Sequence, residues 1–456
     1  MGAAMRGCGP LAALLFFGVR SLCAQQREAD EAWNQGRYEA ARAGYEQILR
    51  QDPSAARANL RMGIMLSWQG KLDSALTLIS RARAAEPADI DMRLAEARVR
   101  SWKGDLSAAE RLYQGIISEH PEDADALAGL GYVYYWEGRE AAARKHAEAA
   151  LTVDSTHKAG RDLLRTIEEA YRPATEGTAS WSNDSDHNTS FGQILSAFAS
   201  PGTSVGIFGS VNALETSDPV LEASRVGGEA GLSVGLGRFQ LTGAAGARRL
   251  FPDVAEPRTA ATYRARLGYR PAPGFSMSVG YSRGPFDEIA SLMERGLDLE
   301  LVEGGFDARP FAGFSIFATG SGLWLSDGNT RTGVLAGLTH KLHRRFTVGL
   351  FGRTLSYEER GVGYFSPDRF SVLEATAGYT IEAKSWSGSV GGGLGAQQIG
   401  ERGAAQGEWH IEGRLARRWG GGNRVEAFGL VTNSAVSSTT GAFRYRSAGV
   451  TVRLGL

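Results

Sequence analysis

The chain has 456 residues, with 50 basic and 50 acidic side chains and a formal net charge of zero. This balance gives no electrostatic reason to expect a nucleic-acid partner. No run of about 20 apolar residues occurs, which excludes a membrane-spanning helix.

The first 24 residues have the pattern of an export signal. Arg6 provides a positive start, residues 11–19 are apolar, and the small residue Ala24 stands at the expected cleavage point. The apolar stretch is too short to cross a bilayer, so we interpret residues 1–24 as a signal peptide. Both cysteines of the chain lie inside this segment, so we expect an exported chain without a thiol for a disulfide or a metal.

A 34-residue period dominates the next part of the chain. Glycine recurs at this spacing, with alanine five residues later and, in three of the four repeats, proline seventeen residues later. The four glycines are Gly36, Gly70, Gly104 and Gly138. Each unit predicts a helix hairpin, because glycine ends the first helix at positive φ and proline ends the second. We therefore predict an α-helical tetratricopeptide-repeat (TPR) solenoid over residues 25–172. Its repeats start near residues 22, 56, 90 and 124, a capping helix follows, and the array serves as a protein-binding scaffold.

Three tryptophans, Trp68, Trp102 and Trp136, also recur at 34 residues, two positions before a turn glycine. They are candidates for an aromatic ladder in the TPR groove that contacts a partner. The alternative is packing between repeats, which the usual burial of large aromatic residues favours.

The composition changes after Pro173. Of the 60 glycines, 14 precede residue 176 and 46 follow it. Helical periodicity gives way to alternation at period two, in segments of about ten residues separated by turn signals. This pattern predicts a short linker over residues 173–177 and an antiparallel transmembrane β-barrel over residues 178–456. The fold class is thus α+β multidomain.

Alternation along residues 408–419 assigns the two faces of this barrel. Apolar residues with tryptophans at both ends, such as Trp409 and Leu415, are expected to face lipid. The charged residues between them are expected to face the lumen. The candidate lumen-lining residues on this and other strands are Arg264, Arg266, Arg270, Asp298, Glu300, Glu408, Glu412, Arg414 and Arg418.

Turn signals divide the barrel region into about sixteen strands. The expected starts are Gly177, Asn188, Ser204, Ala223, Arg238, Arg258, Phe275, Gly296, Phe314, Thr330, Phe346, Arg369, Trp386, Gly407, Arg424 and Phe443. The connections alternate between short and mostly longer ones, as in the outer membrane of bacteria, where short turns face the periplasm. An even strand count with this alternation predicts that the TPR array lies in the periplasm.

This order of elements carries a resemblance to a known family. With its turns at residues 67–70 and 101–104 and its glycine-rich terminal barrel, the chain resembles the YaiO-type outer-membrane β-barrel family. More distantly, it is similar to the outer-membrane exporters of cellulose and poly-N-acetylglucosamine. The resemblance implies an outer-membrane location, repeats that engage a periplasmic or inner-membrane protein, and a barrel that conducts a polysaccharide.

Other chemistry has weaker support in the sequence. Asp184, Asp186 and His187 are explained by a hairpin tip, and His340 and His343 have no serine in a nucleophile setting. We therefore expect no catalytic residue, no metal site and no cofactor. Three functions stay open: a conduit that exports or supports export of a polysaccharide, a non-conducting receptor or structural barrel, and, with the least support from the residues, an outer-membrane enzyme.

Overall fold

The computed structural model describes residues 24–202, 204–272, 274–310, 313–343, 345–434 and 444–456. The expected signal peptide therefore lies outside the described residues. Contacts divide the chain near residue 164 into a helical unit and a strand-containing unit. None of the described helices has the length and apolar character needed to cross a bilayer.

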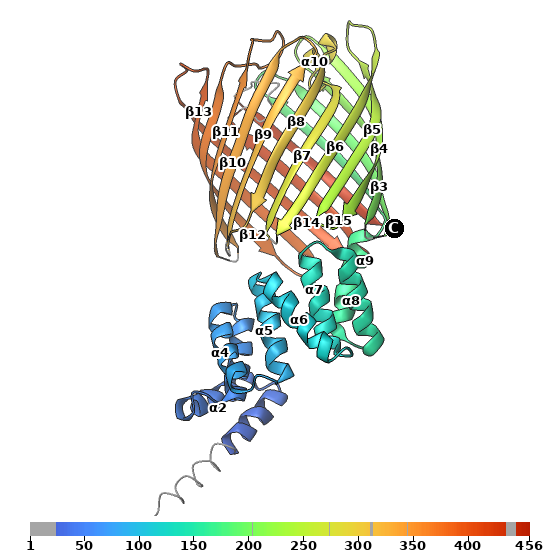
Figure 1. Ribbon diagram of the computed structural model, residues 1–456. Coiled ribbons are helices and arrows are strands. Elements are labelled where there is room, and N and C mark those ends of the chain that lie inside the picture. The colour runs from blue at the N-terminus through green and yellow to red at the C-terminus, as the bar shows by residue number, and fades with distance from the viewer. Residues whose placement is uncertain (1–23, 203, 273, 311–312, 344, 435–443) are drawn as a thin grey trace, which may run out of the picture. The chain divides into compact units, whose positions relative to one another are not determined.

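The helical unit consists of the predicted helix hairpins (Figure 1). Residues 24–34 are helical. The helices that follow are α2 (Tyr38–Gln51), α3 (Ala56–Trp68), α4 (Leu72–Ala85), α5 (Ile90–Lys103), α6 (Leu106–Glu119), α7 (Ala124–Trp136), α8 (Glu140–Val153) and α9 (Lys158–Tyr171). The solenoid is confirmed, and α3, α5 and α7 begin at the predicted starts of repeats two, three and four.

Local sequence explains each hairpin. The four turn glycines have φ between 71° and 90°, a conformation that is strained for residues with a Cβ. Each second helix ends before the proline or serine that follows it. The alanine five residues after each turn glycine is fully buried, since two helices approach closely there.

Sixteen strands in the described part of the chain form a closed antiparallel barrel. They are β1 (Ala174–Asp184), β2 (Thr189–Gly202), β3 (Val205–Ser217), β4 (Glu222–Leu236), β5 (Phe239–Phe251), β6 (Arg258–Ala272), β7 (Phe275–Pro285), β8 (Asp298–Ala308), β9 (Phe314–Leu325), β10 (Thr330–His343), β11 (Phe346–Tyr357), β12 (Phe370–Glu382), β13 (Trp386–Ile399), β14 (Gln406–Trp419), β15 (Asn423–Thr432) and β16 (Tyr445–Gly455). A short helix, α10 (Ala290–Arg295), lies between β7 and β8. Strand β1 begins at Ala174, inside the stretch expected to be a linker, so residues 174–177 are part of the barrel.

The two rims of the barrel differ in their connections. Each strand pairs with its neighbours in sequence, and β1 closes the barrel on β16. The rim that carries both Ala174 and Gly455, here the terminus rim, has the shorter turns, such as those after Gly202 and Ala272. The opposite rim, here the loop rim, carries the longer connections, of which residues 286–297 and 358–369 are two.

Candidate functional site: inner wall and plug of the barrel

One connection identifies the inner face of the barrel. Residues 286–297, between β7 and β8, pack in one cluster with Leu250 of β5 and in another with Leu325 of β9. Phe370 of β12 belongs to the second cluster and contacts Phe365 of the connection 358–369. Strands β5 and β9 lie far apart around the barrel, so one short segment packs against both only from inside. On each of these strands, every second side chain counted from Leu250, Leu325 or Phe370 therefore lies on the inner wall.

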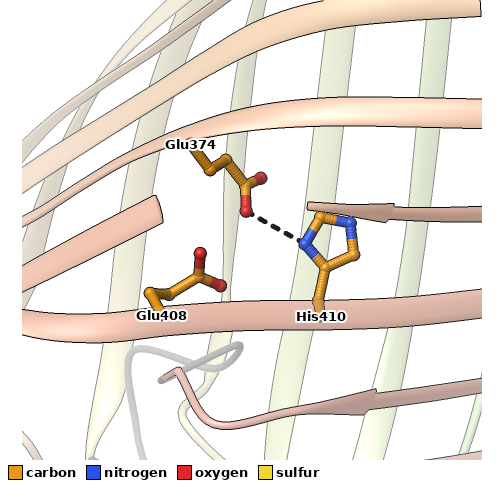
Figure 2. A group of neighbouring side chains, drawn as sticks. All are labelled: Glu374, Glu408 and His410. Atoms are coloured by element: carbon orange, nitrogen blue, oxygen red, sulfur yellow. Dashed lines mark hydrogen bonds and ion pairs between the residues drawn. The ribbon is translucent and has the colours of Figure 1, made fainter. Parts of the chain in front are cut away.

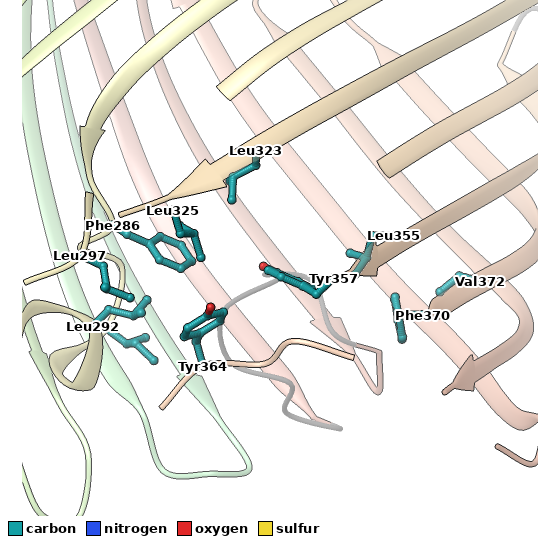
Figure 3. Packing of buried hydrophobic residues seen from close by; sticks show 11 residues of the cluster. Phe286, Leu292, Leu297, Leu323, Leu325, Leu355, Tyr357, Tyr364, Phe370 and Val372 are labelled. Atoms are coloured by element: carbon teal, nitrogen blue, oxygen red, sulfur yellow. The ribbon is translucent and has the colours of Figure 1, made fainter. Parts of the chain in front are cut away.

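Two connections fold inward at the loop rim and pack on each other. We call residues 286–297 and 358–369 the plug. Figure 3 shows its apolar core, in which the rings of Phe286 and Tyr364 meet edge to face at 5.9 Å. The buried residues of this core are Phe286, Ile289, Leu292, Leu297, Leu323, Leu325, Leu355, Tyr357, Tyr364, Phe370 and Val372. Burial of this many apolar side chains stabilises the inward position of both connections.

Polar contacts hold the second plug segment in place. Tyr364 donates a hydrogen bond to Oδ2 of Asp327 at 3.1 Å and accepts one from Nδ2 of Asn329 at 2.8 Å. Burial raises the pKa of Tyr364 to about 12, so the hydroxyl stays protonated and able to donate. Ser291 of α10 donates to the carbonyl oxygen of Gly363 at 3.2 Å, which joins the two segments.

An ion-pair cluster anchors the first plug segment to the wall. Asp287 is 2% exposed and lies between two arginines of the inner face. Its carboxylate is 3.2 Å from Nε of Arg225 on β4 and 3.0 Å from Nη1 of Arg248 on β5. Glu294 accepts hydrogen bonds from the backbone amides of Val254 and Ala255 at 3.1 and 2.6 Å. The segment is thus attached at several points.

The arginines proposed for the lumen on β6 alternate with exposed Tyr263 and share the inner face with Ala260. Arg264 pairs with Glu229 of β4, and Arg266 donates to Oγ of Ser278 at 3.0 Å. Arg270 has the same inward register at the terminus rim. The inner wall here has paired charges of both signs.

Strand β14 has the predicted lumen residues and its large apolar residues on opposite faces. Trp409, Ile411, Leu415 and Trp419 are exposed on the outer face. The predicted lumen residues Glu408, Glu412, Arg414 and Arg418 occupy the other set of positions, on the inner face. Arg414 lies 3.8 Å from Glu426 of β15, which Arg424 also contacts. Mixed charge therefore continues along this part of the wall.

The expectation that Glu300 faces the lumen is wrong. Glu300 pairs in the ladder with exposed Trp324 and lies 3.5 Å from Arg283, on the outer face. The reason is that the inward positions of β8 are taken by leucines that pack against the plug. These are Leu299 and Leu301. Asp298, at the loop-rim end of β8, differs from Glu300 because its carboxylate accepts a hydrogen bond at 2.9 Å from Arg258 of the inner face.

The inner wall also holds a cluster of titratable side chains, and the site prediction named only one of them, Glu408. Glu374 of β12 and Glu408 of β14 are 6% and 5% exposed, and His410 lies beside them (Figure 2). Nδ1 of His410 is 3.0 Å from Oε2 of Glu374. Arg353 of β11 interacts electrostatically with both glutamates. The alternation of β14 placed His410 on the face of Glu408, but Glu374 joins only through the register of β12 and β13.

The three TPR tryptophans are partly exposed, and Trp68 also packs against the preceding repeat. Trp68, Trp102 and Trp136 are 52%, 44% and 43% exposed. Trp68 stacks on Trp33 with ring centroids 5.4 Å apart, and Arg61 lies over the ring of Trp33 at 4.5 Å. The helical unit thus presents large aromatic surfaces to solvent.

Comparison with known proteins agrees with this architecture. The tetratricopeptide repeat family matches residues 32–99 and 103–167. A search of curated proteins gives no match. Among solved structures, a "Bacterial polysaccharide outer membrane secretin" aligns with a TM-score of 0.50 and 11% identity, over 63% of this chain and 99% of that one.

Two further structures align with parts of the chain. CdiB from Acinetobacter baumannii has a TM-score of 0.41 and 9% identity, over 62% of this chain and 60% of that one. The MamA protein has a TM-score of 0.28 and 18% identity, over 32% of this chain and 81% of that one. The chain therefore joins a tetratricopeptide-repeat array to a sixteen-stranded barrel that has the fold of an outer-membrane protein.

Proposed function

We propose that this protein is a YaiO-type outer-membrane barrel that exports, or supports the export of, a polysaccharide, with its TPR array in the periplasm. The barrel acts as a conduit and the plug as its gate. No step of this function requires catalysis or a cofactor.

The observation that carries the proposal is the mixed charge of the inner wall. Arg264 is balanced by Glu229, and Arg414 and Arg424 by Glu426. An ion-selective pore is built from rings of mostly one sign. A wall of paired charges and hydroxyl groups instead suits a neutral or weakly charged polymer, whose hydroxyls exchange hydrogen bonds with it. The name of the aligned structure, a polysaccharide outer membrane secretin, is consistent with such a cargo.

The TPR array has the features of a docking site for a protein. Repeat arrays expose an extended surface, and aromatic residues are enriched at protein interfaces. Trp68, Trp102 and Trp136 supply exposed aromatic surface at a regular spacing. We propose that they contact a periplasmic or inner-membrane partner.

The plug favours a second candidate, a non-conducting receptor or structural barrel. Its apolar core and the Asp287 cluster fix two connections across the inner wall at the loop rim. A plug that never moves would leave the barrel closed. The two functions therefore differ in whether the plug opens.

Recordings in planar lipid bilayers test the proposal. The conduit predicts a conductance with weak ion selectivity that added neutral oligosaccharide reduces. A matched variant that replaces residues 358–369 with a short glycine-serine linker should conduct more often. A folded protein that shows no conductance in either form would favour the receptor or structural function.

A further inference from the structure

We propose that Glu374, Glu408 and His410 form a binding site for Zn²⁺ on the inner wall of the barrel. Each residue offers one ligand atom, and the three atoms lie within 4.8 Å of one another. Tetrahedral ligands at about 2.1 Å from Zn²⁺ are about 3.4 Å apart. Binding requires the two glutamate side chains to rotate until the three atoms reach this spacing, and it leaves a fourth position open.

An unsatisfied buried oxygen points into this cluster. Glu408 is 5% exposed and therefore 95% buried. Its Oε2 has no hydrogen-bond partner in the described part of the chain. Figure 2 shows its carboxylate directed toward that of Glu374. A buried carboxylate oxygen without a donor is costly, and a second carboxylate beside it adds repulsion. A bound cation removes both costs.

The strand between the two glutamates leaves space for an ion. Gly393 of β13 pairs with His410 and faces the inner side between β12 and β14. A Cβ at this position would lie 2.5 Å from Oε2 of Glu374 and 2.6 Å from Cε1 of His410. Any side chain here would therefore fill the place toward which the ligand atoms point.

Charge and donor type both favour a divalent transition ion. Arg353, whose guanidinium lies over the ring of Phe370 at 5.1 Å, supplies one positive charge against the two carboxylates. With a neutral imidazole, the cluster keeps a net charge of −1. Two oxygens and one imidazole nitrogen suit Zn²⁺ better than Ca²⁺ or Mg²⁺, which prefer oxygen ligands only.

A proton shared between Glu374 and Glu408 is the competing explanation, and it predicts no metal binding. The test uses the full chain, purified in detergent without a histidine tag, and titrates Zn²⁺ against a chromophoric chelator. We expect one saturable site per chain. Glu408→Gln should weaken binding at least a hundredfold, because even partners outside the ligand set contribute about 10–100-fold.

Glu412→Gln is the matched control. Glu412 is on the same strand and face but outside the cluster, so this variant should bind Zn²⁺ as the natural chain does. Heat-dependent gel mobility checks that each barrel is folded, and His410→Gln replaces Glu408→Gln if the latter is not. Absence of saturable binding to the natural chain, unchanged affinity in a folded ligand variant, or equal loss in the control overturns the proposal. None of these results depends on whether the barrel conducts.

Discussion

Replacement of Asp287 by asparagine tests whether the plug is a gate. Asparagine keeps the shape of the side chain but removes the charge that faces Arg225 and Arg248. Loss of one partner from a buried ion pair costs about 3–5 kcal/mol. Because the side chain of Arg248 is 32% exposed and partly solvated, we take the lower end, about 3 kcal/mol.

This free-energy cost destabilises only the closed position of the plug, because the wall arginines are solvated again when the plug leaves. At about 1.4 kcal/mol per factor of ten, the ratio of open to closed plug should rise on the order of a hundredfold. Single-channel recording measures this change as open probability. Asp253→Asn is the control, because Asp253 is exposed in the connection between β5 and β6.

A second assay follows the plug without conduction. Ala290 of α10 is 1% exposed, and cysteine is close to alanine in size. Both natural cysteines lie in the expected signal peptide, so Ala290→Cys adds a single thiol to the exported chain. Its labelling by a maleimide should accelerate by a similar factor when Asp287→Asn is added. Unchanged open probability and unchanged labelling in a folded variant would refute the reasoning.

Three further predictions concern the faces of the barrel and the repeats. Leu415→Arg places a charge on the lipid face and should impair assembly by about 2–4 kcal/mol, whereas Arg414→Ala should not. Heat-dependent gel mobility measures both, and equal effects would mean that the assignment of the two faces is wrong. Gly104→Ala should lower the melting temperature of the helices, measured by circular dichroism, because Gly104 has a φ of 90°. Gly115→Ala within α6 should raise it. A change of the melting temperature in the same direction for both variants would contradict the turn assignment. Glu96 has its pKa raised by burial but lowered more by hydrogen bonds from Arg83 and Arg100, so the net shift is downward from 4.5. Its stabilisation is present above pH of about 4.5 and is lost as the pH falls through the lower folded pKa; Glu96→Gln should flatten this acid loss, and an unchanged acid profile would contradict it.

The regular parts of the fold could be predicted because their sequence signals are periodic. Repeat starts at residues 56, 90 and 124 were set by the turn glycines, and strands such as β6 and β9 begin at the predicted residue. The error at Glu300 has a physical cause. Alternation distinguishes apolar from polar positions, and it assigns apolar positions to lipid, but the plug makes part of the inner wall apolar.

The plug itself and the Glu374 cluster had no local signal. Residues 286–297 and 358–369 lack a period, and their inward fold depends on contacts with strands distant in sequence. Glu374 and Glu408 are brought together only by the register of three strands. The partial exposure of the three tryptophans also had no local signal, because a base rate of burial does not say which side of a helix faces a neighbour.

The seam between β1 and β16 constrains how the barrel is made. Thr178 and Thr451 are hydrogen-bonded at 2.9 Å although 273 residues separate them. Until the last strand arrives, every intermediate sheet has two open edges that are able to pair with other chains. Closure of so distant a contact is slow, because a long loop must be ordered first. Between synthesis and closure the strands therefore depend on a chaperone or an insertion machine to cover those edges, and loss of β16 alone is expected to turn the whole domain into an aggregation-prone species.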